Sequence, residues 1–164
     1  MENYFLQESI HIGKLIGMKR KYDNKEEVKI KFDPGKCEAL ISVEDVMITE
    51  VLTVHPDRRV ALARLRMLRY GVGALPVVKK DGTLIGILTL RDIDLAGSDI
   101  HELRVKNLMT SELITRKKDA LISDVVDIMI NTGIQRIPIV DDDNKLIGLV
   151  TQATVIRRIR PLLR

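Results

Sequence analysis

The chain alternates between strand-like and helix-like spacing of its hydrophobic residues. A short β-rich run at 50–55 is followed by a helical pattern that begins near Asp57 and ends at Gly71, a residue suited to the left-handed position after a helix. Two apolar runs then flank the polar residues 79–82, whose Asp-Gly pair is a strong signal for a two-residue hairpin turn. A second helical pattern opens at residue 90. This stretch therefore predicts the order β-α-β-β-α.

The same order recurs 62 residues further on, with no gap between residues 46–94 and 108–156. Seven pairs of identical residues keep this register: Met47 and Met109, Asp57 and Asp119, Met67 and Met129, Gly71 and Gly133, Pro76 and Pro138, Gly86 and Gly148, and Thr89 and Thr151. Two copies are too few for a solenoid, which needs at least about three repeats. We therefore predict an α/β (α+β) fold in which two β-α-β-β-α domains, residues 42–98 and 99–164, pack face to face about a pseudo-twofold axis.

Residues 1–41 have no counterpart in the repeat and form an N-terminal extension whose role is unknown. Alternating apolar residues at 26–32 predict one strand, residues 33–36 predict a turn after it, and residues 11–20 could form a helix. Ser42 is followed by acidic residues and is expected to cap a short helix that leads into the first copy. The extension could pair with a sheet edge or reach a partner chain.

In the second copy the strand is predicted at 112–116, and the helix after it is expected to begin near Asp119. This helix is more apolar than a helix with one buried face should be. Eight of the eleven residues from 120 to 130 are apolar, which gives a stripe wider than the ~100° that a core-facing helix requires. Such a helix is either buried between its sheet and the other copy, or it also contacts a second chain. Since both could hold, we expect a homo-oligomer, most simply a homodimer.

The composition limits which cellular compartments and which binding partners fit this sequence. Cys37 is the single cysteine, so an internal disulfide is excluded, and no apolar run approaches the ~20 residues of a membrane span. We therefore expect a cytoplasmic protein with no membrane segment. The net charge of +4 mildly favours an anionic partner. The basic tail at 155–164 is expected to be the cationic end of a last helix, and contact of this tail with nucleic acid is the less favoured interpretation.

Few features of the sequence suggest catalysis. His11, His55 and His101 lie far apart, with no metal-ligand spacing, and the chain has neither a phosphate-binding loop of the GxxxxGK[ST] type nor a nucleophile elbow. Three consecutive aspartates at 141–143 are expected to form a solvated hairpin tip rather than a metal site. We therefore expect a binding module without a catalytic residue, a metal or a cofactor, rather than an enzyme.

The ends of the predicted strands carry the candidate binding groups. In copy one Thr89 opens the last helix and Asp92 follows one turn later, whereas copy two has Thr151 and Thr154 at these positions. The free N–H groups of a helix start suit phosphate, and Asp92 could accept hydrogen bonds from both hydroxyls of a ribose. The same pair could equally be a capping threonine and an acid favoured by the helix dipole. The residues alone leave this choice open.

Taken together, these motifs resemble tandem CBS domains, the arrangement called a Bateman module. The matching motifs are VM (46–47) and LM (108–109), GVGALPVV (71–78) and GIQRIPIV (133–140), and LIGILTLRDI (84–93) and LIGLVTQATVI (146–156). The resemblance covers about residues 42 to 160. It implies a stand-alone regulatory module with two clefts between the copies, which bind adenosine ligands such as AMP, ADP, ATP or S-adenosylmethionine. Each cleft would take the T-x-x-D segment of one copy and the residues before the proline of the other.

Carried over to this chain, the resemblance implies two unequal clefts. The first would be built from Thr89, Arg91, Asp92, Ile114, Ile134, Gln135, Arg136 and Pro138. In it Asp92 would bind the ribose, Ile114 would flank the base, and Arg136 would bind phosphate unless it is simply a solvent-facing residue at a strand entry. The second would be built from Val72, Gly73, Ala74, Pro76, Thr151 and Thr154. It would have neither the carboxylate nor the arginine, so we expect it to be the weaker cleft, and empty, altered or differently used.

We therefore expect a CBS pair that binds one adenine nucleotide per chain, senses its level and signals to a partner protein by a change of conformation. Two alternatives remain open. One is a nucleic-acid-associated regulator that uses its basic termini, residues 18–25 and the tail. The other is a dimerisation module with vestigial clefts.

Overall fold

The computed structural model describes residues 41–97, 100 and 102–160, which belong to one compact unit. The helix, strand and turn predicted for the N-terminal extension lie outside the described residues. None of the helices in the described ranges combines the length and the apolar character needed to cross a membrane.

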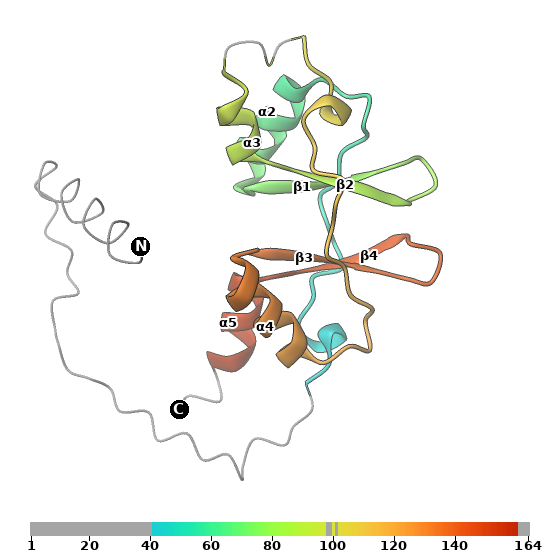
Figure 1. Ribbon diagram of the computed structural model, residues 1–164, viewed down its shortest axis with the longest axis vertical. Helices are drawn as coiled ribbons and strands as arrows, with labels where there is room; N and C mark the ends of the chain where they lie inside the picture. The colour runs from blue at the N-terminus through green and yellow to red at the C-terminus, as the bar shows by residue number, and fades with distance from the viewer. Residues whose placement is uncertain (1–40, 98–99, 101, 161–164) are drawn as a thin grey trace, which may run out of the picture. The chain divides into compact units, whose positions relative to one another are not determined.

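Each copy contains a helix, a two-stranded hairpin and a second helix. Copy one has α2 (Val60–Tyr70), β1 (Ala74–Val78), β2 (Leu84–Thr89) and α3 (Leu90–Leu95). Copy two has α4 (Ile122–Thr132), β3 (Arg136–Val140), β4 (Leu146–Thr151) and α5 (Gln152–Ile159). Short 3₁₀ turns, η2 (Val43–Asp45) and η4 (Val105–Asn107), precede the copies. In each copy the strands pair antiparallel, and the helices lie on the side of the hairpin that faces away from the other copy (Figure 1). The predicted mixed fold is confirmed.

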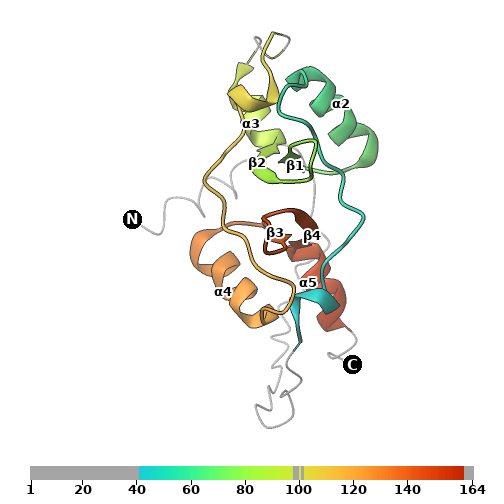
Figure 2. The same ribbon diagram turned by 90° about the vertical axis from the view of Figure 1, so that its right-hand side faces the viewer.

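The two copies are related by an approximate twofold axis. Thr83 pairs with Lys145, its own counterpart in the other copy, as expected for residues that lie on such an axis. The backbone bonds beside this pair come as equivalents, from Leu84 N to Asn144 O at 3.0 Å and from Leu146 N to Gly82 O at 3.1 Å. The hairpins therefore meet at the centre of the pair (Figure 2).

The strands predicted at 50–55 and 112–116 are wrong, because each is reduced to a single parallel bridge, Val54 with Val77 and Arg116 with Ile139. Val54 N donates to Pro76 O, and Val78 N donates to Val54 O, both at 3.0 Å. The next bond toward the N-terminus would require an N–H on the proline, which has none. The proline in each hairpin therefore limits pairing at this edge.

The first helix of each copy begins later than predicted. Helix α2 begins at Val60 rather than near Asp57, and α4 begins at Ile122 rather than near Asp119. The predicted ends are confirmed, since Gly71 has φ 65° and its counterpart in copy two is also left-handed.

The hairpin turns are one residue longer than the Asp-Gly signal predicts. Lys79 N donates to Thr83 O at 3.0 Å, so three residues lie inside the turn rather than two. Gly82 has φ 87° and Asn144, its counterpart, has φ 58°, so the last residue inside each turn is left-handed. A three-residue hairpin loop requires this conformation there.

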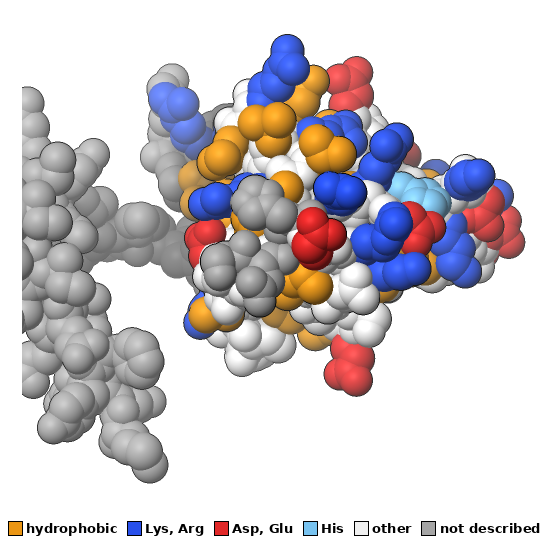
Figure 3. Space-filling view, turned by 90° about the horizontal axis from the view of Figure 1, so that it is seen from above, with side chains coloured by type: hydrophobic (Ala, Val, Ile, Leu, Met, Phe, Trp, Pro, Cys, Tyr) orange, Lys and Arg blue, Asp and Glu red, His pale blue; other side chains and the backbone are white. Residues whose placement is uncertain are grey.

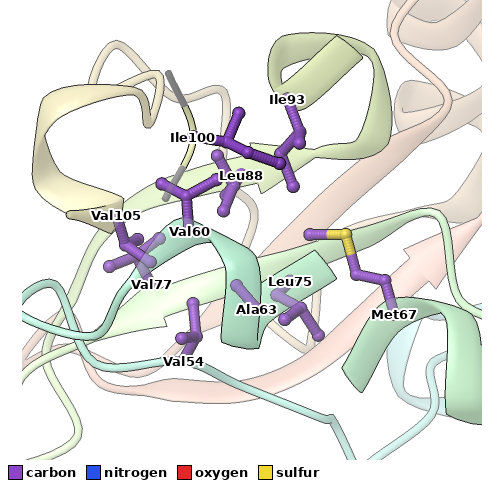
Figure 4. Close-up of a cluster of buried hydrophobic side chains, with 10 residues drawn as sticks. All are labelled: Val54, Val60, Ala63, Met67, Leu75, Val77, Leu88, Ile93, Ile100 and Val105. Carbon is purple, nitrogen blue, oxygen red and sulfur yellow. The ribbon is translucent and has the colours of Figure 1, made fainter. Parts of the chain in front are cut away.

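The core of each copy is completed by the segment that leads into the other copy. Ten buried residues form the core of copy one: Val54, Val60, Ala63, Met67, Leu75, Val77, Leu88, Ile93, Ile100 and Val105 (Figure 4). Ile100 and Val105 follow the copy-one repeat in sequence. In the same way Val43 and Val46, at the start of copy one, are buried in the core of copy two. The two cores are therefore separate, but each includes residues from the segment that leads into the other copy.

The wide apolar stripe of α4 is not explained by burial between its sheet and the other copy, so that prediction is wrong. Only Val125 and Met129 of this helix are buried, and Ile130 is 72% exposed. A two-stranded hairpin covers one face of a helix, and the opposite face of α4 points outward. Exposed leucines on α2 and α3 give copy one a comparable face, where hydrophobic side chains lie among basic ones (Figure 3).

Candidate functional site

Two clefts lie between the copies, and each takes residues from both. The larger, cleft A, has a volume of about 530 Å³, within the range of small-molecule sites. It is lined by Gly73, Ile87, Thr89, Leu90, Arg91, Thr110, Glu112, Leu113, Ile114, Gly133, Ile134, Gln135, Arg136 and Pro138. Apolar side chains form much of this wall, and two arginines and a glutamate are its charged groups.

The structure brings seven of the eight residues predicted for the first cleft together in cleft A. They are Thr89, Arg91, Ile114, Ile134, Gln135, Arg136 and Pro138. Thr89 and Arg91 come from the junction of β2 and α3, and Arg136 is the first residue of β3. Leu90 N donates to Gly73 O at 3.0 Å, which fixes the loop before β1 against the start of α3.

Asp92 is the predicted residue that does not line cleft A. Its Oδ2 atom accepts hydrogen bonds from Thr89 N at 2.8 Å and from Thr89 Oγ1 at 2.7 Å, while Asp92 N donates to Thr89 Oγ1 at 3.1 Å. These bonds form a capping box, in which the cap residue and the third helical residue satisfy each other. The sequence left open whether these two residues cap the helix, and the structure shows that they do. Asp92 holds Thr89 in place at the edge of the cleft.

The second cleft, cleft B, has a volume of about 460 Å³. The predicted residues that line it are Val72, Gly73, Ala74, Thr151 and Thr154. Pro76 does not line it and is buried in β1 instead, where its carbonyl accepts the bond from Val54 N. Further residues in the wall include Glu50, Gln152 and Arg157.

Thr154 repeats the capping geometry of Asp92 without its charge. Thr151 N donates to Thr154 Oγ1 at 3.0 Å, and Thr154 N donates to Thr151 Oγ1 at 3.1 Å. The Thr154 hydroxyl donates its own hydrogen to Thr151 O at 2.9 Å. A carboxylate here would bring a negative charge and further acceptor capacity, whereas the threonine brings neither. Cleft B therefore has no acid at the position that Asp92 occupies in copy one.

The expectation that the second cleft has no arginine is wrong. Arg136 lines both clefts, and Arg157 of α5 lines cleft B. The guanidinium of Arg136 crosses toward copy one, since its Nη2 atom lies 2.8 Å from the place where a Cβ on Gly73 would be. The sequence carried a signal for Arg157, because this residue is the counterpart of Leu95 in the 62-residue register.

The three aspartates at 141–143 form a turn, as expected. Asp141 Oδ1 accepts bonds from Asp143 N at 3.0 Å and Lys145 N at 2.8 Å, and Asp142 forms an ion pair with Lys117 at 3.1 Å. Among the residues that the structure describes, no group of three or more His, Cys, Asp or Glu side chains is arranged to hold a metal ion. The charged groups of the clefts are therefore arginines and single glutamates.

These features define a class of protein: a tandem α+β repeat with two clefts between its copies. Residues 43–98 and 105–161 each match the family model of the CBS domain. The chain therefore belongs to the CBS-domain family, and the resemblance of its motifs to a CBS pair is confirmed.

Curated relatives include both an enzyme and a small CBS protein. The chain is 34% identical over 123 residues to inosine-5'-monophosphate dehydrogenase of Methanocaldococcus jannaschii. The matched region covers 75% of this chain and 24% of the dehydrogenase. It is 39% identical over 113 residues to the CBS domain-containing protein YhcV of Bacillus subtilis, covering 66% of this chain and 79% of that protein. The chain also spans 62% of the uncharacterized protein MK0525 of Methanopyrus kandleri.

Solved CBS pairs share the fold. The structure of CBSX2 from Arabidopsis thaliana in complex with AMP matches with a TM-score of 0.69 and 26% identity, covering 75% of this chain and 98% of that one. The CBS domain pair of protein MJ0100, in complex with 5'-methylthioadenosine and S-adenosyl-L-methionine, matches with a TM-score of 0.67 and 27% identity, covering 73% and 99%.

Proposed function

We propose that this chain is a regulatory module that binds an adenosine-containing ligand in cleft A. The observation that carries this assignment is the convergence of two arginines, Arg91 and Arg136, with an apolar wall in a cleft of about 530 Å³. A nucleotide needs both, because its base is flat and largely apolar on its faces and its phosphate is anionic. Two similar CBS pairs, solved with AMP and with S-adenosyl-L-methionine, support the ligand class.

Each part of the ligand has a candidate partner in this proposal. The adenine would lie against Ile114 and Ile134, and the phosphate would bind the guanidinium of Arg136, which suits bidentate hydrogen bonds. The ribose would bind near Thr89. Both capping bonds to Asp92 use Oδ2, so a ribose hydroxyl could bond to Oδ1 of the same carboxylate.

The role we propose is signalling rather than catalysis. A ligand that contacts both copies favours one arrangement of them, to the extent that it binds that arrangement more tightly. Exposed apolar side chains on α2 to α5, such as Leu65 at 61% and Ile130 at 72%, offer a face for a second copy of the chain or for a regulated protein. We propose a homodimer through these helices, which would carry the change outward.

A thermal-shift screen tests the proposal. At 100 times its dissociation constant, a ligand stabilises the folded state by ~2.7 kcal/mol, which raises the melting temperature of a chain of this size by roughly 5 to 10 °C. We expect such a shift with at least one of AMP, ADP, ATP and S-adenosylmethionine. Ribose 5-phosphate and cytidine monophosphate are the matched controls, since they keep the phosphate and lose the adenine. If none of the four adenosine ligands raises the melting temperature, a dimerisation module with vestigial clefts is favoured instead.

A further inference from the structure

We propose that Arg136 couples the two clefts, so that a phosphate-bearing ligand in one cleft weakens the binding of a second ligand in the other. Three residues line both clefts: Gly73, Gln135 and Arg136. Of these only Arg136 carries a charge. Its guanidinium therefore stands at the wall between two cavities of similar size.

The position of this guanidinium depends on a glycine in the other copy. Arg136 begins β3 and pairs with Thr151, which lines cleft B, while its side chain reaches Gly73 of copy one. The Nη2 atom lies 2.8 Å from the place of a Cβ on Gly73, a separation that a real side chain there would not allow. Gly73 thus leaves the space in which Arg136 can lie between the clefts.

Arg136 gives each cleft its net positive charge. Apart from Arg136, cleft A has one arginine and one glutamate, Arg91 and Glu112, and cleft B has one of each, Arg157 and Glu50. These pairs of opposite charge cancel, so Arg136 is the source of net positive charge in either cleft. A guanidinium that binds phosphate on one side is no longer available to the other. The first anionic ligand therefore leaves the second cleft close to neutral.

The internal repeat shows that the shared arginine breaks the twofold symmetry. Arg136 corresponds to Ala74 in copy one, so there is no second arginine at the equivalent position to serve cleft B. The copies therefore provide three arginines for two clefts. Coupling between sites typically changes an affinity by a factor of about 5 to 150, and it acts equally in both directions. This coupling rests on the proposed function, because it needs a ligand with a phosphate.

The test follows each cleft separately while AMP is added to the full chain. Methyl groups labelled with ¹³C report by NMR on cleft A through Ile114 and on cleft B through Leu52 and Val72, which line these clefts. In the wild type we expect cleft A to fill first. The side chain of Arg91 is exposed and lines cleft A but not cleft B. In Arg91→Gln, AMP binding in cleft A should therefore weaken, which leaves Arg136 available to bind phosphate in cleft B. The dissociation constant for AMP in cleft B should then fall at least fivefold.

Two further variants make the result decisive. In Arg91→Gln combined with Arg136→Gln, the gain in cleft B should vanish, whereas Arg157→Gln should weaken cleft B and leave cleft A unchanged. If both sets of methyl groups respond to AMP but Arg91→Gln leaves the affinity of cleft B as it was, the clefts are independent and the coupling is overturned. If AMP, ADP and ATP move neither set in the wild type, the coupling fails, and if S-adenosylmethionine moves neither set as well, the proposed function fails with it.

Discussion

Replacing Arg136 by glutamine is expected to weaken the binding of AMP at least tenfold. A hydrogen bond to a charged group contributes about 1.5 to 3 kcal/mol, and 1.4 kcal/mol corresponds to a factor of ten in the dissociation constant. Glutamine keeps a polar, similarly placed side chain but removes the charge and the fork of donors. Because Arg136 is only partly buried and takes no part in either core, the variant should remain folded. Isothermal titration calorimetry measures the change.

Adenosine, which has no phosphate, is the matched control ligand for this variant. If Arg136 binds phosphate, its replacement should weaken AMP and leave the affinity for adenosine within about twofold. An equal loss for both ligands would mean that the variant has altered the cleft as a whole, and would contradict a phosphate contact.

Replacing Asp92 by alanine is expected to weaken AMP binding at least tenfold, by a different route. The change removes two hydrogen bonds that hold Thr89 and also the carboxylate oxygen that we propose as the ribose partner. Asp92→Asn separates these effects in part, because its amide oxygen can still accept from Thr89 N while the charge is lost. We expect Asp92→Asn to bind AMP with an affinity between those of the wild type and Asp92→Ala.

Thr154→Ala is the matched control, because Thr154 has the same place in α5 as Asp92 has in α3. It also removes a capping contact, but Thr154 lines cleft B and not cleft A. We expect it to leave AMP affinity nearly unchanged. Calorimetry with 2',3'-dideoxy-AMP completes the comparison, since loss of the ribose hydroxyls should reduce affinity in the wild type and much less in Asp92→Ala. Similar affinities in Asp92→Ala and Thr154→Ala would argue against a ribose contact.

Much of the fold follows from short-range features of the sequence. The register of the repeat predicts the two copies and their axis, and the pairing of Thr83 with its counterpart Lys145 is the contact expected of residues that lie on that axis. Gly71 predicts the end of α2 because the position requires a left-handed backbone. The reduced strand at 50–55 was also within reach, since Pro76 has no N–H to offer.

Other features depend on contacts that sequence spacing does not contain. The exposure of Ile130 depends on how many layers cover α4, and the apolar width of a helix does not reveal this number. The reach of Arg136 depends on the distance between the hairpins and on the space above Gly73. The sequence assigned Arg136 to one cleft because a repeat gives each residue one place in the register. A long side chain near the axis can serve both clefts.

The same pattern holds for residues that sequence reasoning missed. Arg157 corresponds to Leu95, so the register marks it as a difference between the copies but does not say that it faces a cleft. Glu50 and Glu112 are counterparts in the repeat, so a comparison of the copies does not mark them as different. Both are nevertheless charged groups of the clefts. Comparing the copies reveals where they differ, whereas the charge of a cleft depends equally on what they share.

The most direct test of an adenosine ligand in cleft A is a crystal structure of the full chain grown with AMP. We predict density for one AMP per chain in cleft A, with the adenine against Ile114 and Ile134, a ribose hydroxyl bonded to Asp92 and a phosphate oxygen about 2.7 to 2.9 Å from the guanidinium of Arg136. AMP bound in cleft B alone, or in cleft A with its phosphate turned away from Arg136, would contradict the account.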